Sequence, residues 1–368
     1  MKFVIEKGRF QTILGKVQGI VERRSTIPIL SNIVISEEKN NILITATDLE
    51  IGVMEITEAE TVEKGVVCVS ARKLYDMVRE LSEERVEVQE EENFWVSVKA
   101  GKTIFNLPGV DPKEFPTFPS TEGADYFSIE ASVFLDMIEK TAFAASSEES
   151  RFNLNGIYLE KINKDKKEYF RMVATDGHRL SMIDKELKTT LEKGIIISRR
   201  GLTELRRILG DGEGDVRISL KDNNCIFKTD QSIVVVRLLE GEYPDYQQVI
   251  PQANDKHIIL TRKEFIGALR RAHVIASERG EGVRFSINGE VMEIKTGGPD
   301  VGNVQEEIAI DYQGTPLEVN FNARYLLDAL NIMDTEKIRM ELKEELSSGL
   351  IRPVDGEDHL YVIMPMRL

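Results

Sequence analysis

Cysteine is almost missing from this chain, which holds two cysteines among 368 residues. Two cysteines cannot build the disulfide framework that small extracellular domains need. Cys68 lies in the apolar run GVVCVS and Cys225 in NNCIF, so we expect two buried, free thiols on strands. Long apolar runs are missing too, since no window reaches the ~18 apolar residues of a membrane span and MKFVIEKGRF lacks a signal-peptide core. We therefore expect a cytoplasmic protein without a membrane partner.

Catalytic and ligand-binding motifs are equally scarce. The four histidines lack the spacing of metal ligands, and no G-x-x-x-x-G-K-S/T loop is there to bind a nucleotide. They are His178, His257, His273 and His359. The enzymatic alternative is a catalytic set of Asp176, His178 and Ser181, but neighbours on a strand and turn rarely converge on one substrate atom, and no G-x-S-x-G elbow presents a nucleophile. We expect no enzymatic activity, no metal and no cofactor.

Positive charge is in the minority, because 48 Lys and Arg residues face 63 Asp and Glu residues, for a net charge of -15. This balance excludes a protein that binds nucleic acid over its whole surface, but it allows a local basic patch. Apolar residues make up 41% of the chain, which is enough to bury real cores. The length predicts two or three domains.

What the chain does contain is an internal repeat of about 125 residues. One helical pattern has apolar residues at i, i+3 and i+7. Its copies are ARKLYDMVREL (71–81), RRGLTELRRIL (199–209) and ARYLLDALNIM (323–333). A second helical pattern is anchored by a phenylalanine, and its copies are 9–21 with Phe10, 133–145 with Phe134 and 264–276 with Phe265. In addition, ATDLEIGV (46–53) returns as ATDGHRLS (174–181), while a third copy near KTGGPDVG is degenerate.

Short β-branched runs separate the helical patterns. Examples are NIVISEE, NILITAT, GVVCVSA, GIYLEK, SIVVVRLL and YVIMP, bounded by Gly, Asn or Asp as antiparallel meanders are. Each repeat therefore holds two helices and about eight strands. Linker signals at 111–125 and 241–255 fall at the repeat boundaries. We predict an α+β fold of three repeated domains, each with two helices packed on antiparallel sheets, at residues 1–124, 125–254 and 255–368.

Basic residues gather on the outer faces of the predicted helices. They are Lys16, Arg72, Arg79, Arg200, Arg207, Lys263, Arg270 and Arg271. Counted with their flanking residues, the six helical segments carry a formal charge of +10, which leaves -25 on the rest of the chain; the ranges counted are 7–24, 71–81, 132–145, 199–209, 262–272 and 323–333. Basic helix faces on an acidic body predict an anionic ligand confined to one surface. Few aromatic residues interleave with these basic residues, which favours contact with duplex phosphates, without sequence readout, over stacking on single-stranded bases.

The number of helices limits the size of any ring that they line. Six helices at ~10 Å spacing enclose only about 9 Å of clear space, too little for a duplex about 20 Å across. Twelve helices leave about 28 Å by the same arithmetic. A ring for duplex DNA therefore requires two chains, and head-to-tail pairing of the first repeat with the third would close it. Strand edges at the domain ends could continue a sheet across that joint.

Several stretches together resemble the bacterial DNA polymerase III β subunit family. The most specific are VATDGHRL and the final YVIMPMRL, joined by TIPILSN, TATDLE, EGEYPDYQQVIP and FNARYLLDALN. The resemblance implies a DNA sliding clamp, a processivity factor that forms a head-to-tail homodimeric ring around double-stranded DNA with helices lining the pore. It also implies three partners besides DNA: a clamp loader complex, which would be the ATP user, and replicative and repair DNA polymerases.

The resemblance further implies a groove between the second and third domains that binds a short partner peptide ending in bulky apolar residues. By matching motifs, its residues are Arg151, Leu154, Thr175, Gly177, His178, Arg179, Leu180, Pro244, Val249, Asn322, Tyr325, Ser348, Val362, Met364, Pro365, Met366 and Arg367. Met and Leu can repack around different apolar anchors, while Arg and His can fix the polar groups of a peptide.

Other family features carry over less evenly. Arg24 matches a DNA-contacting basic residue, but Gln248 stands where some relatives carry Arg, and Phe152 and Asn153 replace a pair of tyrosines. Glu148 and Glu149 add negative charge beside that pair. The dimer interface implied by the resemblance has an apolar centre with charge pairing around it. Its residues are Lys73, Phe105, Leu107, Val274, Ile275, Glu306 and Glu307.

The remaining alternative is a general DNA-binding protein that holds DNA by charge alone. Such binding weakens steeply with salt through counterion release, whereas a closed ring stays linked to circular DNA. The acidic body and the modest +10 on the helices favour the ring.

Overall fold

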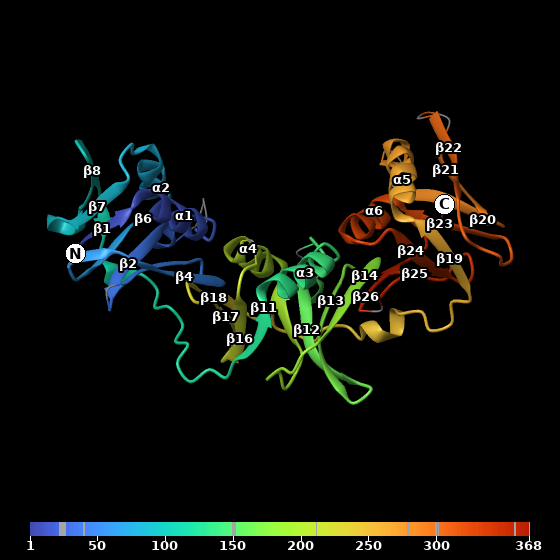
Figure 1. Cartoon of the computed structure of the whole chain (residues 1–368), viewed down its shortest axis with the longest axis horizontal. Coiled ribbons are helices and arrows are strands. Elements are labelled where there is room, and N and C mark those ends of the chain that lie inside the picture. Colours follow the sequence, from blue (N-terminus) through green and yellow to red (C-terminus); the bar gives the residue numbers. More distant parts are fainter. Residues whose placement is uncertain are drawn as a thin grey trace. The chain divides into compact units, whose positions relative to one another are not determined.

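The computed structural model describes residues 1–21, 27–39, 41–148, 152–210, 212–277, 280, 282–298, 300, 302–356 and 358–367. Within them the chain forms six α-helices, and all six lie where the two helical patterns predict them (Figure 1). They are α1 (Lys7–Gln18), α2 (Ala71–Glu80), α3 (Ala131–Ala142), α4 (Arg199–Leu209), α5 (Arg262–Ala276) and α6 (Ala323–Ile332). None of these helices combines the length and the apolar character that a bilayer crossing requires.

Local sequence explains where two helices of the first pattern begin. Ser70 accepts a hydrogen bond from the backbone N–H of Lys73 and caps α2, and Asn322 caps α6 through the N–H groups of Arg324 and Tyr325. Side chains of this type satisfy the first free N–H groups of a helix.

The chain divides into two compact units, residues 1–134 with 200–238 and residues 135–199 with 239–368. The boundary falls within α3 and passes through the second repeat. The second repeat contributes β11 (Phe127–Glu130) and β16 to β18 (within 215–237) to unit 1, and β12 to β15 (within 156–198) to unit 2. The units of packing therefore differ from the units of repetition.

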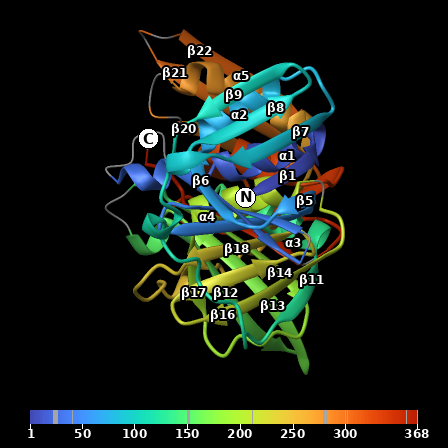
Figure 2. The same ribbon diagram turned by 90° about the vertical axis from the view of Figure 1, so that its left-hand side faces the viewer.

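Unit 1 contains two antiparallel sheets. The smaller, in which Figure 2 shows β7 and β8 side by side, has the order β5 (Glu60–Glu63), β1 (Lys2–Glu6), β7 (Arg85–Glu90), β8 (Val96–Ala100) and β9 (Thr103–Leu107). The larger has the order β10 (Gly109–Val110), β6 (Val66–Ser70), β2 (Asn32–Glu38), β3 (Asn41–Thr47), β4 (Ile51–Glu58), β18 (Ser232–Arg237), β17 (Asn224–Lys228), β16 (Asp215–Lys221) and β11 (Phe127–Glu130). Strands of the first and second repeats therefore share one sheet, joined where β4 pairs with β18.

Unit 2 repeats this plan. Its larger sheet has the order β15 (Ile195–Ser198), β12 (Gly156–Lys164), β13 (Lys167–Thr175), β14 (Arg179–Glu186), β26 (His359–Ile363), β25 (Gly349–Pro353), β24 (Lys337–Leu342) and β19 (Lys256–Thr261). Its smaller sheet has the order β22 (Gly302–Ala309), β21 (Val291–Gly298), β20 (Gly282–Asn288) and β23 (Leu317–Asn322). Here the second and third repeats join where β14 pairs with β26.

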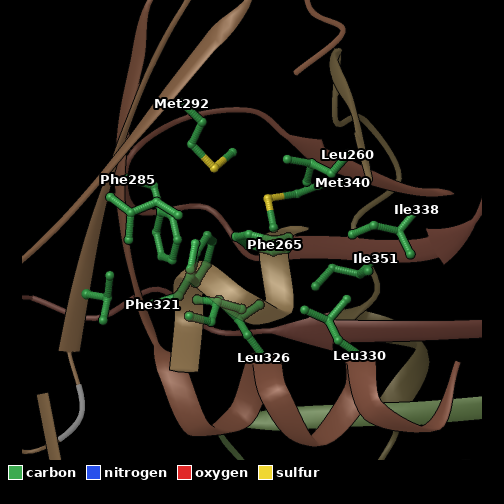
Figure 3. Packing of buried hydrophobic residues seen from close by; sticks show 14 of the residues in the cluster. Leu260, Phe265, Phe285, Met292, Phe321, Leu326, Leu330, Ile338, Met340 and Ile351 are labelled. Atoms are coloured by element: carbon green, nitrogen blue, oxygen red, sulfur yellow. The ribbon is translucent and has the colours of Figure 1, made fainter. Parts of the chain in front are cut away.

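The anchoring phenylalanines of the second helical pattern are buried as predicted, since Phe10, Phe134 and Phe265 are each 0% exposed. In the core of the third repeat, Phe265 meets Phe285 edge to face with ring centroids 6.0 Å apart, and Leu326 and Leu330 of α6 pack into the same cluster (Figure 3). Edge-to-face ring pairs are favourable beyond their buried area.

The two cysteines are buried and free, as predicted. Burial raises the pKa of the Cys68 thiol to about 12, so this cysteine is not a reactive thiolate at neutral pH.

Candidate functional site

The repeated A-T-D motif forms the same tight turn in both units. In unit 2, the Asp176 carboxylate accepts hydrogen bonds from the N–H groups of His178 and Arg179 at 2.9 and 3.1 Å, and Gly177 has a φ of 89°. In unit 1, Asp48 accepts from Glu50 and Ile51 at 2.9 and 2.7 Å. An aspartate that bonds the backbone two and three residues ahead stabilises a turn without any catalytic partner.

An apolar cavity of about 120 Å³ lies beside this turn, wholly within unit 2. Its floor is the surface of the larger sheet, where Leu180 of β14 pairs with Val362 of β26, which in turn pairs with Leu350 of β25. Nine of the residues predicted for the groove line the cavity: Leu154, Thr175, Gly177, Arg179, Leu180, Pro244, Val249, Val362 and Met364. The structure thus brings together residues from β14, from the linker 241–255 and from the C-terminal segment.

The linker wall of the cavity is fixed by two contacts to the sheet. The ring of Tyr243 stacks on Tyr158 with centroids 4.9 Å apart and an angle of 6°. The hydroxyl of Tyr246 donates a hydrogen bond to Glu160 and accepts one from Arg171 at 3.0 Å. Burial, followed by the bond to Glu160, raises the pKa of Tyr246 to about 12, so the hydroxyl keeps its proton at neutral pH.

The C-terminal wall depends on Met364. Its backbone N–H donates to the carbonyl of His178 at 2.9 Å, and its sulfur accepts a hydrogen bond from Ser348 Oγ at 3.0 Å. A thioether on an unbranched side chain adapts its shape readily, which suits a wall that accommodates different apolar side chains.

Two wider, more polar cavities adjoin this one. The first, of about 530 Å³, shares Arg179 with it and is also lined by the predicted residues His178, Asn322 and Tyr325. The second, of about 430 Å³, shares Val249 and Met364 and is also lined by Ser348 and Gln248. The three cavities form one groove with an apolar centre and polar ends.

Arg179 is fixed by contacts within the chain. Its Nε donates to Asp176 at 3.0 Å, one terminal nitrogen to Asp328 at 2.6 Å and the other to the carbonyl of Phe143 at 2.9 Å. The guanidinium also lies 4.4 Å from the centroid of the Tyr325 ring. Three of its five N–H donors are engaged within the chain, so Arg179 is held firmly in the cavity wall.

Sequence reasoning missed two lining residues, Asp245 and Tyr246. The signal was present in EYPDY, because Asp245 caps the short 3-10 turn Tyr246–Val249 and so turns Tyr246 towards the sheet. The predicted residues Pro365, Met366 and Arg367 do not line the three cavities. Arg24, Glu149 and Arg151 lie outside the described residues.

The proposed catalytic set does not assemble. Ser181 is 0% exposed, and its hydroxyl donates to the carbonyl of Lys140 and meets Nε2 of His359 at 3.1 Å. The ring of His178 instead stacks beside Tyr325, and Asp176 is engaged by its own turn. A serine that is buried and whose hydroxyl donates its hydrogen bond to a backbone carbonyl cannot attack a substrate.

The basic helix residues lie at the surface as predicted, but most of them have acidic neighbours. Arg72 and Arg79 lie 3.8 and 3.7 Å from Asp76, Arg200 lies 2.6 Å from Asp48, and Lys16 lies 3.4 Å from Glu55. Arg271 pairs with Glu306, and Arg270 donates to the side chain of Asn331. Lys263 is exposed. Pairing reduces the positive field of these helix faces.

Arg207 caps a neighbouring helix, a role that its sequence pattern did not indicate. Its guanidinium donates to the carbonyl of Gly15 at 2.9 Å and to that of Lys16, both in the last turn of α1. The last carbonyls of a helix have no partners within the helix and carry negative partial charge. Arg207 therefore stabilises the contact between α4 and the end of α1.

The smaller sheet of each unit has an edge strand paired on one side only, β9 with β8 in unit 1 and β22 with β21 in unit 2. Near these edges Val274 is 68% and Ile104 is 56% exposed, and Ile104 was not predicted. Lys73 and Glu307 are exposed, while Phe105 and Ile275 are half-buried. Leu107 is only 1% exposed, which removes it from the surface where it was expected, because it is the last residue of β9 and points into the core. Glu306 is already paired with Arg271, and the hydrogen bond from Arg271 lowers the pKa of the Glu306 carboxyl group.

Three models of one family match the chain from end to end. The N-terminal, central and C-terminal domains of the DNA polymerase III beta subunit match residues 1–119, 128–245 and 247–367. The chain belongs to the DNA polymerase III beta subunit family.

Individual members of the beta subunit family agree with this assignment. The beta sliding clamp of Pseudomonas aeruginosa is 34% identical, with all of both chains covered, and that of Salmonella typhimurium is 31% identical with the same coverage. A crystal structure of the P. aeruginosa beta subunit superimposes with a TM-score of 0.94 at 33% identity over all of both chains. A sliding clamp from Bartonella birtlesii bound to griselimycin gives a TM-score of 0.95 at 34% identity, again over all of both chains.

Proposed function

We propose that this chain is a DNA sliding clamp, a non-enzymatic processivity factor of the replicative polymerase that forms a homodimeric ring around double-stranded DNA. The observation that carries the proposal is the end-to-end match to the beta subunit family, whose curated relatives are named beta sliding clamps. The three repeats, at residues 1–124, 125–254 and 255–368, are its domains, and two copies supply the twelve helices that a pore for duplex DNA requires.

Ring closure would use the open edges of β9 and β22. Head-to-tail pairing joins β9 of one protomer to β22 of its partner, which continues a sheet across the joint and satisfies N–H and C=O groups that are otherwise unpaired. Val274, Phe105 and Ile275 supply the apolar centre, with Ile104 added by the structure. Lys73 and Glu307 supply charge at the rim of that interface.

Contact with DNA would be loose and would not read sequence. The candidate DNA-facing residues are Lys16, Arg24, Arg72, Arg79, Arg200, Arg207, Lys263, Arg270 and Arg271. Because acidic neighbours neutralise much of this charge, the field suffices to centre the duplex without holding one register. A ring that is topologically linked to DNA needs no tighter grip in order to remain on it.

The groove of unit 2 would bind the short peptides by which polymerases and the clamp loader attach. Its apolar centre takes a bulky side chain over Leu180 and Val362, and its polar ends, with His178, Asn322 and Ser348, take the peptide backbone and polar side chains. We place this work in the cytoplasm, where the chromosome is replicated.

Retention on circular DNA tests the proposal. The protein is loaded onto nicked circular DNA by a bacterial clamp loader with ATP, the salt is raised, and half of the sample is linearised before gel filtration. We expect retention on circles and loss from linear DNA. Equal loss from both, with a loader verified on its own clamp, would leave only electrostatic DNA binding and would contradict the ring.

A further inference from the structure

In each unit, strands of two successive repeats pair and join the repeats into one sheet, and we call this place a junction. The two junctions are built in the same way. In the first junction, Gly52 of β4 pairs with Val235 of β18, which pairs with Ile226 of β17. In the second, Leu180 pairs with Val362, which pairs with Leu350. Gly52 and Leu180 occupy the same position in the repeated A-T-D motif, 128 residues apart. The surface that forms the floor of the groove in unit 2 therefore has a counterpart in unit 1.

A linker crosses this surface in both junctions. Each linker contains an aspartate that caps a short 3-10 turn, Asp111 through the N–H of Lys113 at 2.9 Å and Asp245 through that of Gln247 at 3.3 Å. In the second junction the linker residues Tyr246 and Val249 pack on the sheet. In the first, Phe118 packs on Ile226, Ile233 and Val235 together with Met54 and Ile56.

The two junctions differ in what covers the corresponding residues Gly52 and Leu180. In the second, Leu180 is the floor of an open cavity of about 120 Å³. In the first, the corresponding residue has no side chain, and the ring of Phe118 takes that room, because a Cβ on Gly52 would stand 3.0 Å from its Cε2 atom. Ordinary carbon contacts lie at about 3.5–4.0 Å, so the ring fits Gly52 and excludes a larger residue.

We propose that the first junction is a second groove for a bulky apolar side chain, and that the chain's own Phe118 occupies it. Phe118 lies between Pro116 and Pro119, and a residue before proline prefers an extended backbone, so segment 114–120 lies across the sheet at low entropic cost. The geometry assigns the chain one open groove and one filled groove. A peptide with an aromatic anchor gains entry to the first junction only when the ring of Phe118 leaves it.

Methionine methyl groups report on both junctions of the full-length protein. Met54 packs in the first junction, while Met182 and Met364 belong to the second. The probe is an acetylated and amidated peptide with the sequence of residues 114–120, EFPTFPS, and its control carries alanine at the second phenylalanine. Both are titrated into 13C-methyl-methionine protein, as wild type and as the Phe118→Ala variant.

We expect saturable movement of the Met54 resonance in Phe118→Ala and at least about tenfold weaker response in the wild type, because the internal occupant reduces the fraction of open groove. The control peptide should move Met54 in neither protein. An unmoved Met54 in a variant whose Met182 and Met364 resonances remain native would overturn the proposal, as would equal movement in the wild type.

Gly52→Ala provides an independent test should Phe118→Ala fold poorly. The added methyl group displaces the Phe118 ring, so the Met54 resonance should shift without any peptide and respond to the peptide afterwards. A Met54 resonance unchanged in Gly52→Ala would show that Phe118 does not occupy this position. Neither measurement depends on DNA, a loader or a dimer, so the clamp function and this inference can fail separately.

Discussion

His359 illustrates how one buried polar residue links this fold to pH. It is 2% exposed, its Nε2 meets Ser181, and its Nδ1 has no hydrogen-bond partner among the described residues. Burial, reinforced by the charge of Lys140, lowers its pKa from 6.5 to about 4, although Asp358 and Asp136 act in the opposite direction. The folded chain therefore keeps this ring neutral where an unfolded chain would protonate it.

We expect His359 to make the protein less stable in mild acid. Because its folded pKa is depressed, its contribution is complete above about pH 6.5 and is lost as the pH falls from there towards 4. Between pH 7.5 and pH 5 the loss is about 2 kcal/mol. Urea unfolding at the two pH values should show this loss in the wild type but not in His359→Gln, whose amide can still bond Ser181. An identical pH dependence in both proteins would assign the loss to other groups.

The contribution of Arg207 to stability can also be tested at the scale of one residue. Arg207→Ala removes the cap on the Gly15 and Lys16 carbonyls, and hydrogen bonds from charged donors contribute about 1.5–3 kcal/mol. Arg72→Ala removes the same charge from an exposed side chain with only a 3.8 Å contact to Asp76. Thermal unfolding should therefore show a lowered Tm for Arg207→Ala and a nearly unchanged Tm for Arg72→Ala. Equal effects would mean that Arg207 acts only through its charge.

At the scale of elements, the turns and linkers decide where the groove lies. The β13–β14 turn sets Thr175, Gly177 and Arg179 around the cavity, and the second linker closes it from the other side. The contacts that hold the linker, Tyr243 on Tyr158 and Tyr246 between Arg171 and Glu160, lie mostly behind the cavity wall. The shape of the groove thus depends on contacts that a ligand does not make.

Tyr246→Phe should weaken ligand binding although it leaves the ring in the cavity wall. The variant loses the hydroxyl that joins Arg171 to Glu160, so the linker is held less firmly and a ligand must order it on binding. Griselimycin, which is bound in the B. birtlesii clamp structure, serves as the probe in calorimetry, with affinity expected to fall several-fold. The control is Gln247→Ala, an exposed linker residue outside the central cavity. Unchanged affinity for Tyr246→Phe would mean that the Tyr243 stack alone fixes the wall.

At the scale of the whole molecule, we expect the open edges of β9 and β22 to govern assembly. Val274→Asp places a charge where we propose an apolar contact with the partner's β9 edge, and burying an unpaired charge is strongly unfavourable. Sedimentation analysis should show a wild-type dimer and a predominantly monomeric Val274→Asp. Val291→Asp, at a residue 42% exposed on β21, is the matched control and should remain dimeric. A dimeric Val274→Asp would place the interface elsewhere.

Loss of the ring should also remove topological retention. Val274→Asp should be lost from nicked circles at the same rate as from linear DNA. Its affinity for griselimycin should equal that measured for the wild type, since the cavity lies wholly in residues 135–199 and 239–368. A variant that lost both properties would be misfolded, which separates ring closure from general damage.

Local patterns in the sequence determined a large part of this protein. The 3.6-residue periods located all six helices, the repeated A-T-D located the turns, and burial of Phe10, Phe134 and Phe265 followed from their place on the apolar stripes. Matching motifs also gathered nine residues that share one cavity. These features depend on neighbours in the chain or on recurrence at a fixed spacing, which a sequence displays directly.

Tertiary structure alone decided the partners of the charged residues. Arg207 and Arg72 look alike in sequence, yet one caps α1 and the other reaches into solvent, and Arg179 is engaged by Asp176, Asp328 and the carbonyl of Phe143. Likewise, only the packing shows that Phe118 fills the room left by Gly52, while Leu180 underlies an open cavity. Such pairings join residues far apart in the chain, and hydrogen-bond geometry and close packing select them only once the sheets have brought the partners together.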